Sequence, residues 1–201
     1  MCVVNNLICF QHCCTTYIFC KTVPEKCPIC DNFLTTLLLE PFVIPYPLVN
    51  AKDYPCSIVV RPSVGSFLDD YNVNNDLHIG ITNSSGMVIE YDECGLVRDD
   101  GDKWKCCASI RLIPESWVTF WDENLNKMCN DVIWNANNYD NAEFNCFNFV
   151  ISFLKELKYS DIQFMNKVDM CKEFILPRIQ NILKYVSLCN YLKDKEVYVQ
   201  D

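Results

Sequence analysis

The sequence predicts an α+β protein in which an antiparallel sheet packs on helices, with a small module at the N-terminal end. Segments with strand patterns come before the long helical segments and do not alternate with them as parallel βαβ units would. Half of the 201 residues are hydrophobic and 13% are aromatic, which is enough for one sizeable core. The chain has five glycines and no internal repeat, so neither a solenoid nor a linker-rich protein is expected.

The N-terminal module is predicted from its cysteines, because seven of the chain's 15 fall within the first 34 residues. Cys27 and Cys30 have the C-x-x-C spacing that lets two thiolates on a tight turn face one Zn²⁺. His12 and Cys13 are the expected further ligands, with Cys9 as the alternative. We therefore predict a structural zinc ion in a zinc-ribbon-like module over residues 1–40, with no open position for catalysis.

Another interpretation treats these cysteines as small apolar residues of a short β segment, because free cysteine is often buried. A strand is predicted over 15–23 from its β-branched and aromatic residues. Four prolines then predict an extended connection over 41–55. The second domain is accordingly expected over 56–201.

The second domain is expected to begin with strands and continue with helices. Its strand-like segments lie at 57–61, 77–82, 87–91 and 105–112. Asn83 to Gly86 supply the turn residues of a hairpin. A helical or mixed segment is predicted over 117–134, helices from Cys146 and over 177–192, and a last short strand at 196–199.

Cys146 is the candidate nucleophile, because the free N–H groups and dipole at a helix start stabilise a thiolate. The same N–H groups, with the Asn145 side chain, could donate to an oxyanion. His78, one of only two histidines, lies in a predicted strand and is the expected base. If Asn83 pairs with Gly86, Tyr91 lies opposite His78 and orients it, with Asp76 as the other reachable group.

Both residues also have a structural interpretation. Cys146 lies on the apolar stripe of its own helix, and a single histidine on a half-buried strand is usually structural. Nearby carboxylates would also raise the pKa of a thiol. Two hypotheses therefore stand: a thiol hydrolase that cleaves an amide or isopeptide bond through acyl-Cys146, and a non-enzymatic interaction or scaffold protein on the same fold.

Charge and hydropathy limit the partners. Residues 41–154 hold seven Lys or Arg against sixteen Asp or Glu, a balance of −9 that equals the net charge of the whole chain. This field repels polyanions, so we expect a protein partner or protein substrate and no nucleic acid. The sequence shows neither a signal peptide nor an apolar stretch of ~20 residues, which predicts a soluble, non-secreted protein of the cytoplasm, with the nucleus as the alternative.

Several strings of residues, spread over nearly the whole chain, resemble one family. They are Phe10-Gln11-His12-Cys13, Cys27-Pro28-Ile29-Cys30, Arg61-Pro62, Asp76-Leu77-His78-Ile79-Gly80, Trp121-Asp122, Asn145-Cys146, Pro177-Arg178 and Val197-Tyr198-Val199. Together they resemble the makorin-2 opposite-strand protein family. The resemblance implies an N-terminal zinc-binding-like module and a C-terminal domain.

The His78 strand and Asn145-Cys146-Phe147 are also similar to the permuted papain-like group, which includes deSUMOylating isopeptidases and lecithin retinol acyltransferase-like proteins. This similarity implies a permuted papain-like domain with His78 as base and Cys146 as nucleophile. The chain departs from the acyltransferases, because it lacks their second histidine and their membrane segment. A peptidase or isopeptidase is therefore the sharper expectation.

Overall fold

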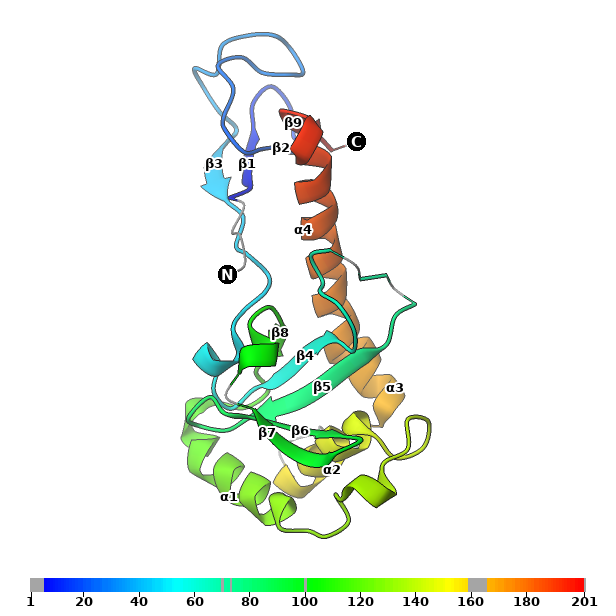
Figure 1. Cartoon of the computed structure of the whole chain (residues 1–201). Coiled ribbons are helices and arrows are strands. Elements are labelled where there is room, and N and C mark those ends of the chain that lie inside the picture. Colours follow the sequence, from blue (N-terminus) through cyan, green and yellow to red (C-terminus); the bar gives the residue numbers. More distant parts are fainter. Residues whose placement is uncertain (1–5, 70, 73, 100, 159–165, 201) are drawn as a thin grey trace. The chain divides into compact units, whose positions relative to one another are not determined.

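The computed structural model describes residues 6–69, 71–72, 74–99, 101–158 and 166–200 (Figure 1). The chain forms two compact units, Met1–Pro47 with Leu183–Asp201 and Leu48–Ile182. Each unit contains one antiparallel sheet. The predicted α+β class is confirmed.

The sheet of the first unit has four strands in the order β3, β1, β2, β9. Their bounds are Leu39–Val43, Ile8–Gln11, Ile18–Cys20 and Val197–Val199. β9 pairs with β2 through Ile18↔Val199, Phe19↔Tyr198 and Cys20↔Val197. The last turns of helix α4 (Leu176–Asp194) supply Tyr185, Cys189 and Leu192 to a core with Leu7.

The observed units differ from the predicted domain boundaries at both ends. Residues 183–201 pack with the N-terminal module, because β9 pairs with the edge of β2 and α4 covers Leu7. The segment predicted as a connection begins with strand β3, whose Pro41 is accommodated because β3 is an edge strand.

The sheet of the second unit has five strands in the order β7, β6, β5, β4, β8. Their bounds are Gly95–Asp99, Val88–Asp92, Leu77–Thr82, Ile58–Pro62 and Ala108–Ile110. The four predicted strands are confirmed, and β7 was not predicted because its Arg98 and Asp99 break the apolar pattern.

Helices follow the strands of this unit, as predicted. α2 (Cys146–Leu157) packs against β5 and β6, and α1 (Val118–Cys129) packs against α2. The shorter helical segments are η1 (Ala51–Asp53), η2 (Asp102–Trp104), η3 (Glu115–Trp117), η4 (Ala136–Asn138), α3 (Lys167–Met170) and the π-helical η6 (Cys171–Ile175).

Both faces of the five-stranded sheet are buried, which is why its central strands are almost continuously apolar. Alternation along β4, β5 and β6 places Ile79, Ile81 and Tyr91 on one face. The other face carries Val59 and Val88, which pack in a cluster with Ala51, Trp104 and Cys107. Arg61, His78 and Glu90 share this second face.

The β5–β6 hairpin has a different register from the one predicted. Asn83 N–H donates to Met87 O, and Thr82 pairs with Val88. The turn therefore contains three residues, Ser84 to Gly86, and not the two of the predicted register. Gly86 takes the left-handed conformation, φ +82°, that such a turn requires. A shift of one residue reverses the faces. The prediction that Tyr91 lies opposite His78 was therefore wrong. Glu90 lies on the same face of the sheet as His78.

Candidate functional site

The start of helix α2 is fixed by a capping box. Asn145 Oδ1 accepts from Phe147 N–H at 3.0 Å, and Asn145 N–H donates to Asn148 Oδ1 at 3.0 Å. Asn145 Nδ2 donates to the Asn141 carbonyl at 2.7 Å, which ties the preceding loop to the helix. Asn145 thus holds Cys146 at the first position of the helix, where the dipole favours a thiolate.

Cys146 is one of the groups that act on His78. The described pairing of β5 with β6 ends at Gly80↔Glu90, so His78 lies two residues beyond it. Cys146 lies close enough to His78 to raise the pKa of the imidazole. Both residues are buried, with exposed fractions of 4% for Cys146 and 7% for His78.

The second partner of His78 is Glu90, which the sequence analysis missed. His78 Nε2 lies 2.7 Å from Glu90 Oε2, and Glu90 is fully buried in β6. A signal was present in the sequence, because Glu90 is a lone acid in the apolar run Val88-Ile89-Glu90-Tyr91. Buried acids are rarely found without a partner.

The pKa values show how strongly these groups interact. Burial lowers the pKa of His78, but the hydrogen bonds and negative charges of Cys146 and Glu90 outweigh it and raise that pKa to about 9. Burial raises the pKa of Glu90, whereas the hydrogen bond and charge of His78, with Arg61 and Lys103, bring it below the ordinary 4.5. The protonated imidazole and the ionised carboxylate therefore stabilise each other.

Tyr91 points away from this group. Its ring packs edge-on against Trp134, Tyr139 and Phe144 at centroid distances of 5.2 to 5.9 Å. Its hydroxyl donates to the Asn135 carbonyl at 3.0 Å. Tyr91 thus anchors the loop that leads into Cys146 and does not orient His78. Asp76, the other predicted orienting group, is exposed.

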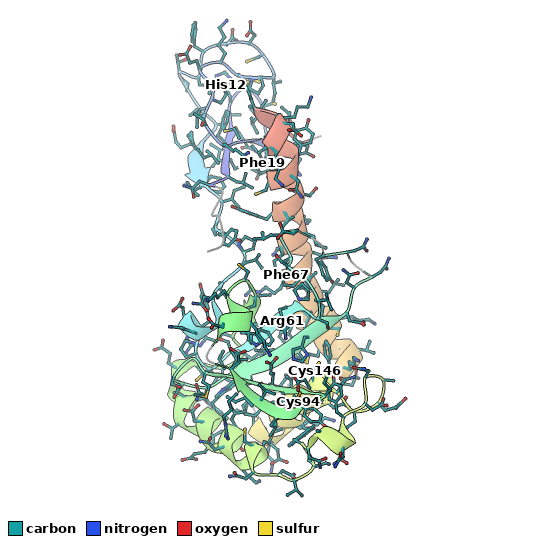
Figure 2. The ribbon with its side chains drawn as sticks, viewed as in Figure 1. His12, Phe19, Arg61, Phe67, Cys94 and Cys146 are labelled. Atoms are coloured by element: carbon teal, nitrogen blue, oxygen red, sulfur yellow. The ribbon has the colours of Figure 1, made fainter. Side chains whose placement is uncertain are left out.

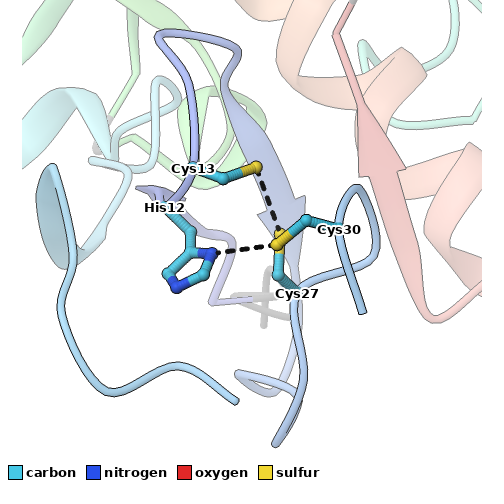
Figure 3. Close-up of side chains that lie close together, drawn as sticks. All are labelled: His12, Cys13, Cys27 and Cys30. Carbon is cyan, nitrogen blue, oxygen red and sulfur yellow. Dashed lines mark hydrogen bonds between the residues drawn. The ribbon is translucent and has the colours of Figure 1, made fainter. Parts of the chain in front are cut away.

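The predicted metal ligands are brought together in the first unit. His12, Cys13, Cys27 and Cys30 place their ligand atoms within 4.8 Å of one another, so the four could hold a metal ion (Figure 3). Cys13 Sγ lies 3.9 Å from Cys27 Sγ, and Cys30 Sγ lies 3.5 Å from His12 Nδ1. Cys9, the alternative ligand, lies outside this group and is buried in β1.

The turn of the C-x-x-C motif favours the thiolate form of Cys27. Burial raises the pKa of its thiol, but the backbone N–H groups of Ile29 and Cys30 lower it to a net value of about 7. The Ile29 N–H donates to Cys27 Sγ at 3.4 Å. A thiolate is the form that binds metal.

The fold and the two clusters together define an α+β protein with a buried thiol–imidazole–carboxylate group and a separate His/Cys cluster. Within the described ranges, no helix has the length and apolarity needed to span a membrane. Residues 41–192 match the family described as DUF4796 C-terminal, and residues 5–34 match DUF4796 N-terminal. The chain belongs to this DUF4796 family.

One relative is the human MKRN2 opposite strand protein, which is 31% identical over 97% of this chain and 89% of the relative. No solved structure matches the chain.

Proposed function

We propose that Cys146, His78 and Glu90 form the active site of a cysteine hydrolase on a permuted papain-like domain, which cleaves an amide or isopeptide bond of a protein substrate. The observation that carries this proposal is the buried hydrogen bond of 2.7 Å between His78 and Glu90, with Cys146 as another group that raises the pKa of the same imidazole. A nucleophile, a base and a group that orients the base are the parts that acyl transfer needs.

The reaction follows from these positions. With its pKa raised to about 9, His78 holds a proton near pH 7. The imidazolium stabilises the Cys146 thiolate, which attacks the carbonyl carbon of the substrate. N–H groups at the start of α2 stabilise the oxyanion. The imidazolium protonates the leaving amine, which departs from a thioester on Cys146. Water then attacks the thioester with His78 as base, which releases the acid and restores the thiolate and the imidazolium.

Glu90 acts on this cycle through the imidazole. Its Oε2 accepts from Nε2, so Nδ1 is the nitrogen left for the thiol. The carboxylate stabilises the imidazolium that forms when the thiol ionises. Glu90 thus takes the orienting place that Tyr91 and Asp76 do not fill.

A second candidate function is favoured by one observation, the 4% exposure of Cys146. In this alternative the protein has no catalytic activity and serves as an interaction or scaffold protein, with Cys146 as a core thiol. A substrate would reach Cys146 only if neighbouring side chains move. The two candidates differ in whether the thiol can be reached from solvent.

Labelling with a thiol-directed electrophile distinguishes them, read out by mass spectrometry at each cysteine. The exposed Cys94 is the internal reference (Figure 2). The hydrolase requires Cys146 to react faster than Cys94 near pH 7, and His78→Asn to abolish that advantage. Cys94→Ala should leave the Cys146 rate unchanged. If Cys146 reacts only after unfolding, the interaction protein is the correct candidate.

We also infer that the four-residue cluster holds a structural zinc ion. Three sulfurs and one imidazole nitrogen are the donor set of closed, tetrahedral zinc sites. The core beside it is small, with Phe10, Ile18, Cys20 and Cys27 as its buried members. Such a core gains most from a metal that links its turns.

A further inference from the structure

We propose that Arg61 is a positioning residue of the thiol–imidazole–carboxylate site, which fixes the Glu90 carboxylate and limits how tightly His78 holds its proton. The consequence for catalysis rests on the proposed function. The electrostatic role itself can be measured without any substrate.

The guanidinium and the imidazole share one carboxylate oxygen. Arg61 of β4 is the direct cross-strand partner of His78 in β5. Its Nη2 lies 3.5 Å from Glu90 Oε2, the same oxygen that accepts from His78 Nε2. The three charged groups thus lie side by side on three neighbouring strands and on one face of the sheet.

Arg61 is held in place by contacts on two further sides. Its Nη1 donates to the carbonyls of Pro62 and Ser63 at 3.1 and 3.4 Å. Its Cζ lies 4.9 Å from the ring centroid of Trp104, and the imidazole of His78 lies 5.9 Å from the same tryptophan. The side chain is 21% exposed, so water screens its charge only in part.

The balance of charge gives Arg61 its role. The titratable groups that act on His78 are Cys146 of α2 and Glu90 of β6. Arg61 and Lys103, the latter in η2, act on Glu90, and Arg61 is the one of these two cations paired with its carboxylate. With Arg61 present, part of the negative charge of Glu90 is already compensated. Without it, the full carboxylate charge would bind the imidazolium proton more tightly and hinder its transfer to a leaving amine.

The experiment is an NMR titration of the imidazoles, and the chain has only two histidines to assign. His78→Asn identifies the His78 signal. Arg61→Gln should raise the midpoint of His78 by about one pH unit, as expected for the loss of a unit charge a few ångströms away. Arg61→Lys keeps the charge and should restore the wild-type midpoint within a few tenths of a unit. The full-length protein is used throughout.

The outcomes separate this proposal from the proposed function. An unchanged or lower His78 midpoint in Arg61→Gln, with wild-type circular dichroism, overturns the role of Arg61. A Cys146 that reacts no faster than Cys94 in the wild-type protein overturns the hydrolase and leaves the titration valid. If Arg61→Gln does not fold, Arg61→Lys decides, because a midpoint that moves by a full unit despite the retained charge contradicts an electrostatic role.

Discussion

His78 Nε2 and Glu90 Oε2 lie 2.7 Å apart although the two residues are not cross-strand partners. Glu90 pairs with Gly80, and its side chain reaches diagonally to the imidazole two residues further along β5. Gly80 lets Val88 and Trp104 pack closely on this face, because a Cβ there would lie 3.0 Å from Val88 and 3.3 Å from Trp104. The ion pair is therefore enclosed by the sheet and the Trp104 cluster.

Glu90→Ala should destabilise the protein strongly, because it leaves His78 and the largely buried Arg61 without their carboxylate. We expect a loss of roughly 3–5 kcal/mol in the free energy of unfolding by urea, as for other broken buried pairs. Glu156→Ala is the matched control, because its exposed ion pair with Lys127 at 3.4 Å should contribute less than about 1 kcal/mol. If the two variants lose the same free energy of unfolding, Glu90 does not form a stabilising buried ion pair.

Stability should decrease in alkaline solution because of His78. Its pKa is raised from the ordinary 6.5 to about 9 in the folded protein. A raised pKa gives stability that is fully present below pH 6.5 and is lost as the pH rises through about 9, a change of roughly 3 kcal/mol. The check is the free energy of unfolding against pH for the wild type and His78→Gln. The difference between them should shrink from pH 6.5 to 9, and a constant difference would refute the shift.

Metal content should depend on the knuckle cysteines. Purified wild-type protein should hold about one zinc ion per chain. Cys27→Ser or Cys30→Ser should lose most of it and lower the stability of the first unit, and a strong chelator should have the same effect. Cys9→Ala is the control that keeps its metal, since Cys9 lies outside the cluster. Retention of zinc by Cys27→Ser would eliminate this site.

The turn between β5 and β6 should not tolerate a side chain at Gly86. Its φ of +82° is unfavourable for other residues, and a Cβ there would overlap the backbone carbonyl of Lys52. Gly86→Ala should cost on the order of 2 kcal/mol in unfolding free energy. Ser85→Ala, one residue away and exposed, should be close to neutral. If both variants are equally stable, the three-residue turn is wrong.

Local patterns predicted the elements that depend on neighbouring residues. The stripe from Cys146 became α2, and the run Leu77–Thr82 became β5 with the same bounds. The metal cluster could also be expected, because C-x-x-C is a local signal. In each case the residues that decide the structure lie within a few positions of one another.

The details of the candidate active site depended on turn length, which composition does not determine. Asn83 to Gly86 suit a turn of two or of three residues, and the conformation of Gly86 decides between them. The turn length therefore decides whether Tyr91 or Glu90 lies beside His78. Glu90, an acid between the apolar Ile89 and the aromatic Tyr91, was the available sign of the second register.

The pairing of β9 with β2 has a consequence for biosynthesis. Residues 18–20 leave the ribosome some 180 residues before their strand partners at 197–199. The β2 edge of the first unit therefore stays unpaired while the whole second unit is synthesised. Closing so long a loop carries a large entropic cost. Early metal binding at the C-x-x-C turn would keep the N-terminal segment compact during this time. We expect chaperones to bind the nascent chain, or wrong strand pairing to begin, at the unpaired edge of β2.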